Sequence, residues 1–210
     1  MPRRYTLGKR ADIKADTRAR IIAAAVDIYR DRGMAAASNL AIARAADVAP
    51  ATIRNHFADP SQLASAVFDE VLVELRPPGQ EIFDGTEGIA NRIRLLATEL
   101  ASFYERSEPW WRAYQREPAL IEAWSSGVDR YYRDIDDLMR AALGPLAADE
   151  RALAVVAAVI GPPTFFALRA RGLSSEQAVD LGAELAVPWL EAREAEVRTP
   201  GRSVGTDADH

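Results

Sequence analysis

Six polar side chains between residues 38 and 56 are of the types that bind nucleic acid. An arginine can donate two hydrogen bonds to a phosphate or to the O6 and N7 atoms of guanine, and an asparagine can pair with the edge of adenine. Hydroxyl groups and imidazoles can donate to phosphate oxygens. The candidates for DNA contact are Ser38, Arg44, Thr52, Arg54, Asn55 and His56. Each could equally be an ordinary solvated side chain, so the elements that position them decide between these interpretations.

Three short helices are predicted around these residues. The first is expected from Asp16 to Arg32, ended by Gly33, and the second over 38–46 with Ser38 as its N-cap. After a break at residues 47–48, Pro50 suits the first position of a third helix through Phe57, because proline has no N–H to leave unpaired. The apolar stripe of the first helix is Ile21, Ile22, Ala25, Val26 and Tyr29. Two short helices joined by a tight turn can place the second in the major groove of DNA.

Charge is distributed unevenly along the chain, whose formal net charge is −5. Residues 1–58 hold eleven Lys and Arg against five Asp, whereas residues 59–210 carry an excess of acidic side chains. Phosphate contacts by Lys and Arg supply much of the affinity for DNA, so the N-terminal part is the expected DNA-binding part. A basic, flexible arm is predicted over 1–15, and its Arg3, Arg4, Lys9, Arg10 and Lys14 could reach phosphates or a minor groove.

Composition argues against several other classes of function. The chain has no cysteine and two histidines, His56 and His210, which leaves little for a thiol or metal site, and no cofactor is expected. No Ser/His/Asp order or glycine-rich phosphate loop indicates an enzyme, and Asp134, Asp136 and Asp137 are interpreted as a solvated helix face. We find neither a secretory signal nor an uninterrupted apolar run, so we expect a cytoplasmic protein.

Several short stretches of the N-terminal part match the sequence pattern of a known family when they are taken together. They are residues 17–25, 32–34, 42–49, 52–53 and 56–57, followed by Leu63. As a set they resemble the N-terminal domain of the TetR family of repressors, over about residues 15 to 65 without a gap. The resemblance implies a helix-turn-helix domain on a helical body that dimerises and binds a small molecule. It also implies that Thr52 and His56 lie where the family commonly touches DNA, and Phe57 where it packs the core.

The chain departs from the family pattern at several places. Where the family often has a tyrosine, this chain has Arg54, and Asp47 takes the place of the family's turn glycine. Ala49 replaces the family's serine cap, and Pro60 replaces its phosphate-facing lysine. Arg54 keeps recognition of phosphate or guanine possible. Loss of the lysine should weaken anchoring to the DNA backbone. In the second helix the family's apolar position falls on Asn39 and its polar position on Leu40.

The predicted fold is all-α with about nine helices. The helix-turn-helix domain is expected over 16–58, a connecting helix over 59–78, the helical body over 79–198, and a disordered tail over 199–210. Helices of the body are predicted from Pro and Gly signals at 86–107, 109–116, 118–143, 148–171, with a kink or break at 161–163, and 174–197, bent at Pro188. Aromatic side chains in the body could line an effector pocket or form an ordinary core, and the pocket candidates are Trp110, Tyr114, Tyr131 and Phe165. The expected dimer interface consists of Leu153, Val156, Ile160, Leu181, Leu185 and Trp189.

These expectations combine into a ligand-responsive DNA-binding regulator. It would be a homodimeric repressor, released from a palindromic operator in double-stranded DNA by an unknown small apolar or aromatic effector, with no membrane partner. A protein-interaction adaptor with a weakened DNA-binding head is the alternative, because the unusual second helix and Pro60 leave the strength of DNA binding open.

Overall fold

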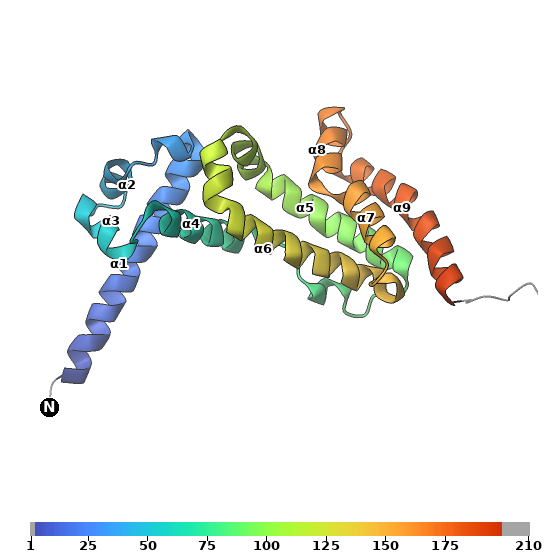
Figure 1. The fold of residues 1–210 in the computed structure, drawn as a ribbon, viewed down its shortest axis with the longest axis horizontal. Coiled ribbons are helices and arrows are strands. Elements are labelled where there is room, and N and C mark those ends of the chain that lie inside the picture. Colours follow the sequence, from blue (N-terminus) through green and yellow to red (C-terminus); the bar gives the residue numbers. More distant parts are fainter. Residues whose placement is uncertain (1–2, 199–210) are drawn as a thin grey trace, which may run out of the picture. The chain divides into compact units, whose positions relative to one another are not determined.

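The computed structural model describes residues 3–198, and it describes side chains for all of these except residues 3–9, 116 and 118–121. Within this range the chain forms helices and connecting turns without a β-strand, which confirms the predicted all-α class (Figure 1). The tail predicted to be disordered, 199–210, lies outside the described residues, as do the side chains of Arg3, Arg4 and Lys9.

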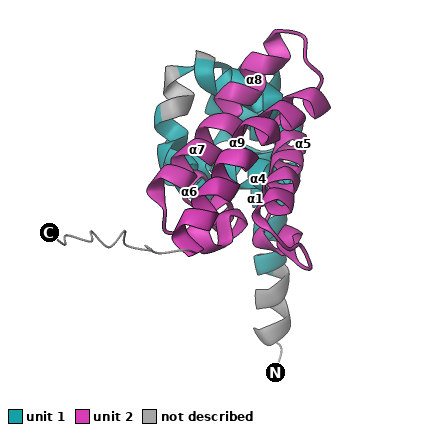
Figure 2. Ribbon diagram, turned by 90° about the vertical axis from the view of Figure 1, so that its right-hand side faces the viewer, with its two compact units in different colours: residues 1–76, 106–131 teal, residues 77–105, 132–210 magenta. Residues whose placement is uncertain are grey.

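The chain divides into two compact units, coloured separately in Figure 2. Unit 1 comprises residues 1–76 and 106–131, and unit 2 comprises 77–105 and 132–210. The helices of residues 1–76 are α1 (Arg3–Arg32), α2 (Asn39–Ala45), α3 (Pro50–His56) and α4 (Pro60–Leu75), with a 3₁₀ turn η1 (Met34–Ala36). Helices α5 (Ile89–Arg116) and α6 (Pro118–Leu143) each contribute residues to both units.

Unit 1 is built on α1, which packs against both α2 and α4. Its apolar stripe is buried as predicted, and Ile21 and Ala25 are 0% exposed. The segment 106–131 joins this unit through an aromatic cluster. Trp124 lies 5.3 Å from Phe68 and 5.7 Å from Trp110, measured between ring centroids, and its indole N–H donates to the Ala64 carbonyl at 3.0 Å.

Unit 2 contains the remaining parts of α5 and α6 and the last three helices. These are α7 (Glu150–Ile160), α8 (Pro162–Ala170) and α9 (Ser175–Arg198), preceded by the short turns η2 (Gln80–Phe83) and η3 (Gly144–Leu146). Helix α9 packs against both α7 and α8. Asp149 caps α7 by accepting hydrogen bonds from the amides of Arg151 and Ala152, and it forms an ion pair with Arg193 of α9 at 2.7 Å. This ion pair and the caps hold the pKa of Asp149 below its usual value, with the Arg193 hydrogen bond as the largest cause.

The predicted start of the first helix is wrong. Helix α1 begins at Arg3 rather than Asp16. The prediction followed the apolar stripe, which begins at Ile21, but a helix can extend upstream of its buried part, and no proline interrupts residues 3–20. The Thr17 hydroxyl donates to the Ile13 carbonyl at 2.8 Å, and Asp16 pairs with Arg20 at 3.6 Å, so local contacts support the exposed turns.

Two proline predictions had different outcomes. Separate helices over 86–107 and 109–116 were expected, but α5 runs without interruption through Pro109, so that prediction is wrong. A proline removes one backbone donor, and packing on both sides of it can keep a helix continuous despite that loss. By contrast, the predicted break at 161–163 is confirmed, because Gly161 has extended backbone angles (φ −71°, ψ 164°) and separates α7 from α8.

One segment has the length and composition of a membrane-spanning helix. Within residues 150–170, a window of 18 residues reaches a mean hydropathy of 1.7, and 33% of that window is buried. The structure divides this segment at Gly161 into two short helices, and a helix needs roughly 20 continuous residues to cross a bilayer. Its apolar composition therefore fits packing against protein better than a membrane span.

Candidate nucleic-acid interface

Helix α2 begins and ends where its sequence signals predict. The hydroxyl oxygen of Ser38 accepts a hydrogen bond from the amide of Ala41 at 3.2 Å, which confirms Ser38 as the N-cap. Ile42 and Ala43 are buried at 1% exposure each, so α2 is held against the rest of unit 1. Ser38 and Arg44 remain exposed, at the beginning and in the last turn of the helix.

The turn between α2 and α3 is closed by backbone hydrogen bonds. Asp47 adopts a left-handed conformation with φ 52°, and the amide of Val48 donates to the Ala43 carbonyl at 3.0 Å. Glycine adopts this conformation at less cost, and aspartate is among the few other residues that tolerate it. Ala49 offers no side-chain cap to α3, so Pro50 at the first position is the remaining start signal.

Helix α3 presents one face to the core and another to solvent. Ile53 (2% exposed) and Phe57 at its C-cap (4%) are buried, which anchors the helix on that side. Arg54 and Asn55 are exposed on the other side, whereas Thr52 is half-buried. Arg54 and Asn55 are thus accessible on the solvent side of α3.

His56 lies at the C-terminal end of α3 in a different environment. Its side chain is half-buried, and its Nδ1 atom is buried with no hydrogen-bond partner among the described residues. Burial, followed by the positive charges of Lys14 and Arg18 on α1, lowers the pKa of His56 below 6.5. The neutral form of the imidazole is therefore favoured. Arg18 also lies over the Phe57 ring, 5.1 Å from its centroid.

The start of α4 lacks a basic side chain. Pro60 occupies the first position, and the Asp59 carboxylate accepts from the amide of Gln62 at 2.9 Å. This confirms the predicted cap. An aspartate and a proline at this position offer no cation to a phosphate group.

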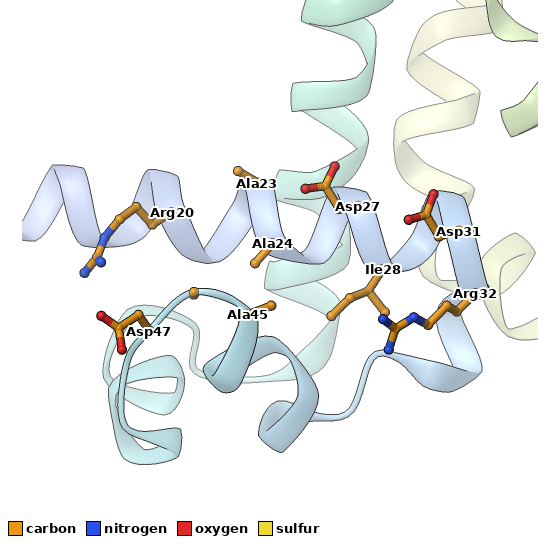
Figure 3. Close-up of a pocket in the computed structure, with 10 residues that line it drawn as sticks. Arg20, Ala23, Ala24, Asp27, Ile28, Asp31, Arg32, Ala45 and Asp47 are labelled. Carbon is orange, nitrogen blue, oxygen red and sulfur yellow. The ribbon is translucent and has the colours of Figure 1, made fainter.

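A groove in unit 1, not foreseen from the sequence, lies between α1 and the segment 45–47 (Figure 3). Its volume, measured as the space open to the centre of a water molecule, is about 440 Å³. The charged lining residues are Arg20, Asp27, Asp31, Arg32 and Asp47. Three carboxylates against two guanidinium groups make this surface unfavourable for phosphate.

The predicted effector residues are divided between the two units. Trp110 is 6% exposed within the aromatic cluster of unit 1, and Tyr114 and Tyr131 are half-buried residues of the same unit. Phe165 belongs to unit 2, where it lines a small apolar cavity with Tyr104 and Ile160. Measured in the same way as the groove, this cavity has a volume of about 10 Å³. A single effector pocket containing all four residues stays a prediction.

The predicted dimer residues fall into two groups. Leu153, Val156 and Ile160 of α7 are at most 8% exposed within one copy of the chain, so they are not available to a partner in this conformation. On α9, Leu185 is 62% exposed, and Leu181 and Trp189 are half-buried. The α9 residues remain candidates for an interface. Asp134, Asp136 and Asp137 are exposed on α6, as expected for a solvated face.

Comparison with known proteins supports the assignment of the N-terminal helices. The model of the family of bacterial regulatory proteins named tetR matches residues 21–67, which include α2, α3 and their turn. No curated protein matches the chain. Residues 21–67 are therefore similar to the N-terminal domain of the tetR family of bacterial regulatory proteins, and this domain indicates a DNA-binding transcription regulator.

Proposed function

We propose that this regulator is a homodimeric repressor, which a small apolar or aromatic effector releases from a palindromic operator in the cytoplasm. The observation that carries the proposal is the arrangement of α3, whose Arg54 and Asn55 are exposed while Ile53 and Phe57 anchor the opposite side. A helix held in this way behind a capped α2 suits insertion into the major groove, about 12 Å wide.

Effector response is supported by the two helices that the units share. Residues Ile89–Glu105 of α5 belong to unit 2, and the same helix continues into unit 1 with Trp110. Helix α6 likewise carries Trp124, whose indole is hydrogen-bonded to α4 within unit 1. A ligand that favours one position of these helices in unit 2 would shift the population of unit 1 conformations.

The interior of unit 2 supports the proposed apolar class of effector. The small cavity beside Phe165 is lined by aliphatic and aromatic side chains from α5, α7, α8 and α9. Drug-sized ligands occupy cavities of roughly 300–1,000 Å³, so an effector would have to part these helices on entry. Such an opening favours an apolar ligand, because the surface it exposes is apolar.

Dimerisation is supported by the outer face of α9. An exposed leucine at 185, with Leu181 and Trp189 at helical spacing, forms an apolar stripe that one copy of the chain leaves partly uncovered. A two-fold dimer places two α3 helices on two half-sites, which is why the operator should be a palindrome. Leu185→Glu should weaken the dimer, as measured by sedimentation equilibrium.

The test of the proposed function is selection of bound sequences from random duplex DNA with the purified protein. An enriched palindrome is expected. The variant Arg54→Ala/Asn55→Ala should then lose affinity for it, since a bidentate base contact contributes about 1–3 kcal/mol of discrimination, on the order of tenfold in Kd. Arg94→Ala, which removes an exposed arginine from unit 2, is the matched control and should bind normally. No enriched sequence, with folded dimeric protein, would refute the proposal and favour the adaptor.

A further inference from the structure

The N-terminal turns of α1 carry three basic residues in register with its buried stripe. A helix has about 3.6 residues per turn, so residues seven or eleven positions apart lie within roughly 20° of each other. Arg10 and Lys14 precede Ile21 by these intervals, and Arg18 precedes Ala25 by seven positions. The face of α1 that is buried in the core of unit 1 therefore continues, towards the N-terminus, as a basic face.

Charge is segregated on this part of α1. Asp12 lies nine positions before Ile21, which places it about 180° away from the buried stripe. Asp16 is also directed away from the stripe and forms an ion pair with Arg20. Arg10, Lys14 and Arg18 are all exposed, and within the described part of the chain none of them forms an ion pair. We call these three residues the α1 basic stripe.

The α1 basic stripe is continuous with the end of α3. Arg18 is stacked over Phe57, which directly follows α3. Lys14 and Arg18 are also the charges that act on His56, so both lie close to the last turn of that helix. From Arg18 to Arg10 the stripe extends about 12 Å along α1, at 1.5 Å per residue. Residues 10–14 thereby project beyond α3 within unit 1 (Figure 1).

We propose that the α1 basic stripe is a second DNA-contacting surface, which holds the phosphate backbone beside the base pairs contacted by α3. This inference rests on the proposed function. It differs from a flexible arm that enters the minor groove, because an α-helix with side chains is about 10–12 Å wide and that groove is about 6 Å wide. The stripe therefore contributes affinity and orientation without reading bases. It also supplies the cations that Asp59 and Pro60 do not offer at the start of α4.

The test compares two double variants that remove equal charge. Arg10→Gln/Lys14→Gln neutralises the projecting part of the stripe and leaves Arg18 on Phe57, while Arg94→Gln/Arg133→Gln neutralises two exposed arginines of unit 2. Glutamine forms helices about as well as arginine and lysine, so α1 should persist. Circular dichroism of both variants checks this point.

Kd for the selected operator is measured across a range of salt concentrations. Each lost phosphate contact reduces the slope of log K against log salt by about 0.9. The stripe variant should lose up to about two units of slope and bind roughly tenfold or more weakly at 0.1 M salt, with its ranking of operator variants unchanged. The unit 2 variant should keep the wild-type slope.

Three results would overturn the inference, and they are distinguishable. A stripe variant with the slope of the unit 2 variant would show that Arg10 and Lys14 do not contact phosphate. A changed ranking of operator sequences would show that the stripe reads bases instead. If the wild-type protein itself selects no DNA, the proposed function fails and this inference fails with it.

Discussion

Replacing Gly127 with alanine is expected to destabilise unit 1, although alanine is the better helix former. Gly127 lies in α6, and a Cβ atom added there would be 2.5 Å from Cδ1 and 2.7 Å from Cε1 of Phe68. Neighbouring side chains leave the Phe68 ring little space to move away from a new methyl group. It is 6% exposed and packs edge-on against Trp124, which is itself tied to α4 by the indole hydrogen bond.

The size of the effect follows from two opposing contributions. Glycine to alanine in a helix interior stabilises by about 1 kcal/mol. Overpacking a well-packed core costs about 1–3 kcal/mol, and contact with several atoms of a confined ring belongs in the upper part of that range. Gly127→Ala should therefore lower the free energy of unfolding by about 1–2 kcal/mol.

Gly182→Ala in α9 is the matched control. A Cβ atom there would lie 3.4 Å from Cγ2 of Ile160 and 3.6 Å from the carbonyl oxygen of Val159, which are ordinary contact distances. The helix-propensity gain should then dominate, and the protein should become more stable by up to about 1 kcal/mol. Urea denaturation followed by circular dichroism, at one fixed protein concentration, measures both variants.

Equal stabilisation by the two substitutions would refute this account of the aromatic cluster. A double variant locates the cause. With Phe68→Leu in place, adding Gly127→Ala should cost little or should stabilise, because the ring that the new methyl group meets has been removed. If the cost of Gly127→Ala persists in that background, it arises from something other than contact with Phe68.

Three further predictions concern the DNA-binding helices. Ser38→Ala removes the cap of α2 and should lower the free energy of unfolding by about 1 kcal/mol, as measured by urea denaturation. Asp47→Gly relieves the left-handed conformation in the turn and should raise the midpoint of thermal unfolding; a lower midpoint would show that the Asp47 side chain stabilises the turn. Because burial, Lys14 and Arg18 lower the pKa of His56, the unfolded chain binds this proton more readily, so stability should fall as the pH drops below 6.5. His56→Gln should remove that part of the pH dependence between pH 7 and 5, and an unchanged pH profile would contradict the assignment.

Local signals predicted the DNA-binding helices well. Ser38, Asp59 and Gly33 act where the sequence places them, because a cap or a left-handed glycine depends on only a few neighbouring residues. The start of α1 and the continuity of α5 through Pro109 were missed for a related reason. For α1 the prediction relied on the buried stripe, which the exposed first turns lack although they are helical. For α5 it relied on one proline, whose effect longer-range packing outweighed.

The candidate site was only partly predictable. Exposure of Arg54 and Asn55 follows from the spacing of Ile53 and Phe57, since one face of a short helix must be buried. The role proposed for Arg18 was not foreseen, although the four-residue spacing of Arg10, Lys14 and Arg18 is visible in the sequence. That spacing places the three side chains on one face only if α1 is helical throughout this segment, which the structure shows.

By itself the sequence determined the helical class, the caps and turn of the DNA-binding helices, and the family of residues 21–67, because these depend on local spacing and residue type. Only the tertiary structure decided which distant residues meet. It places Trp110 and Trp124 in the core of unit 1, buries Leu153, Val156 and Ile160 within one copy of the chain, and brings Lys14 and Arg18 to the end of α3. An aromatic or aliphatic stripe looks the same in sequence whether it covers a core, a pocket or a partner, because burial depends on what the rest of the chain packs against it.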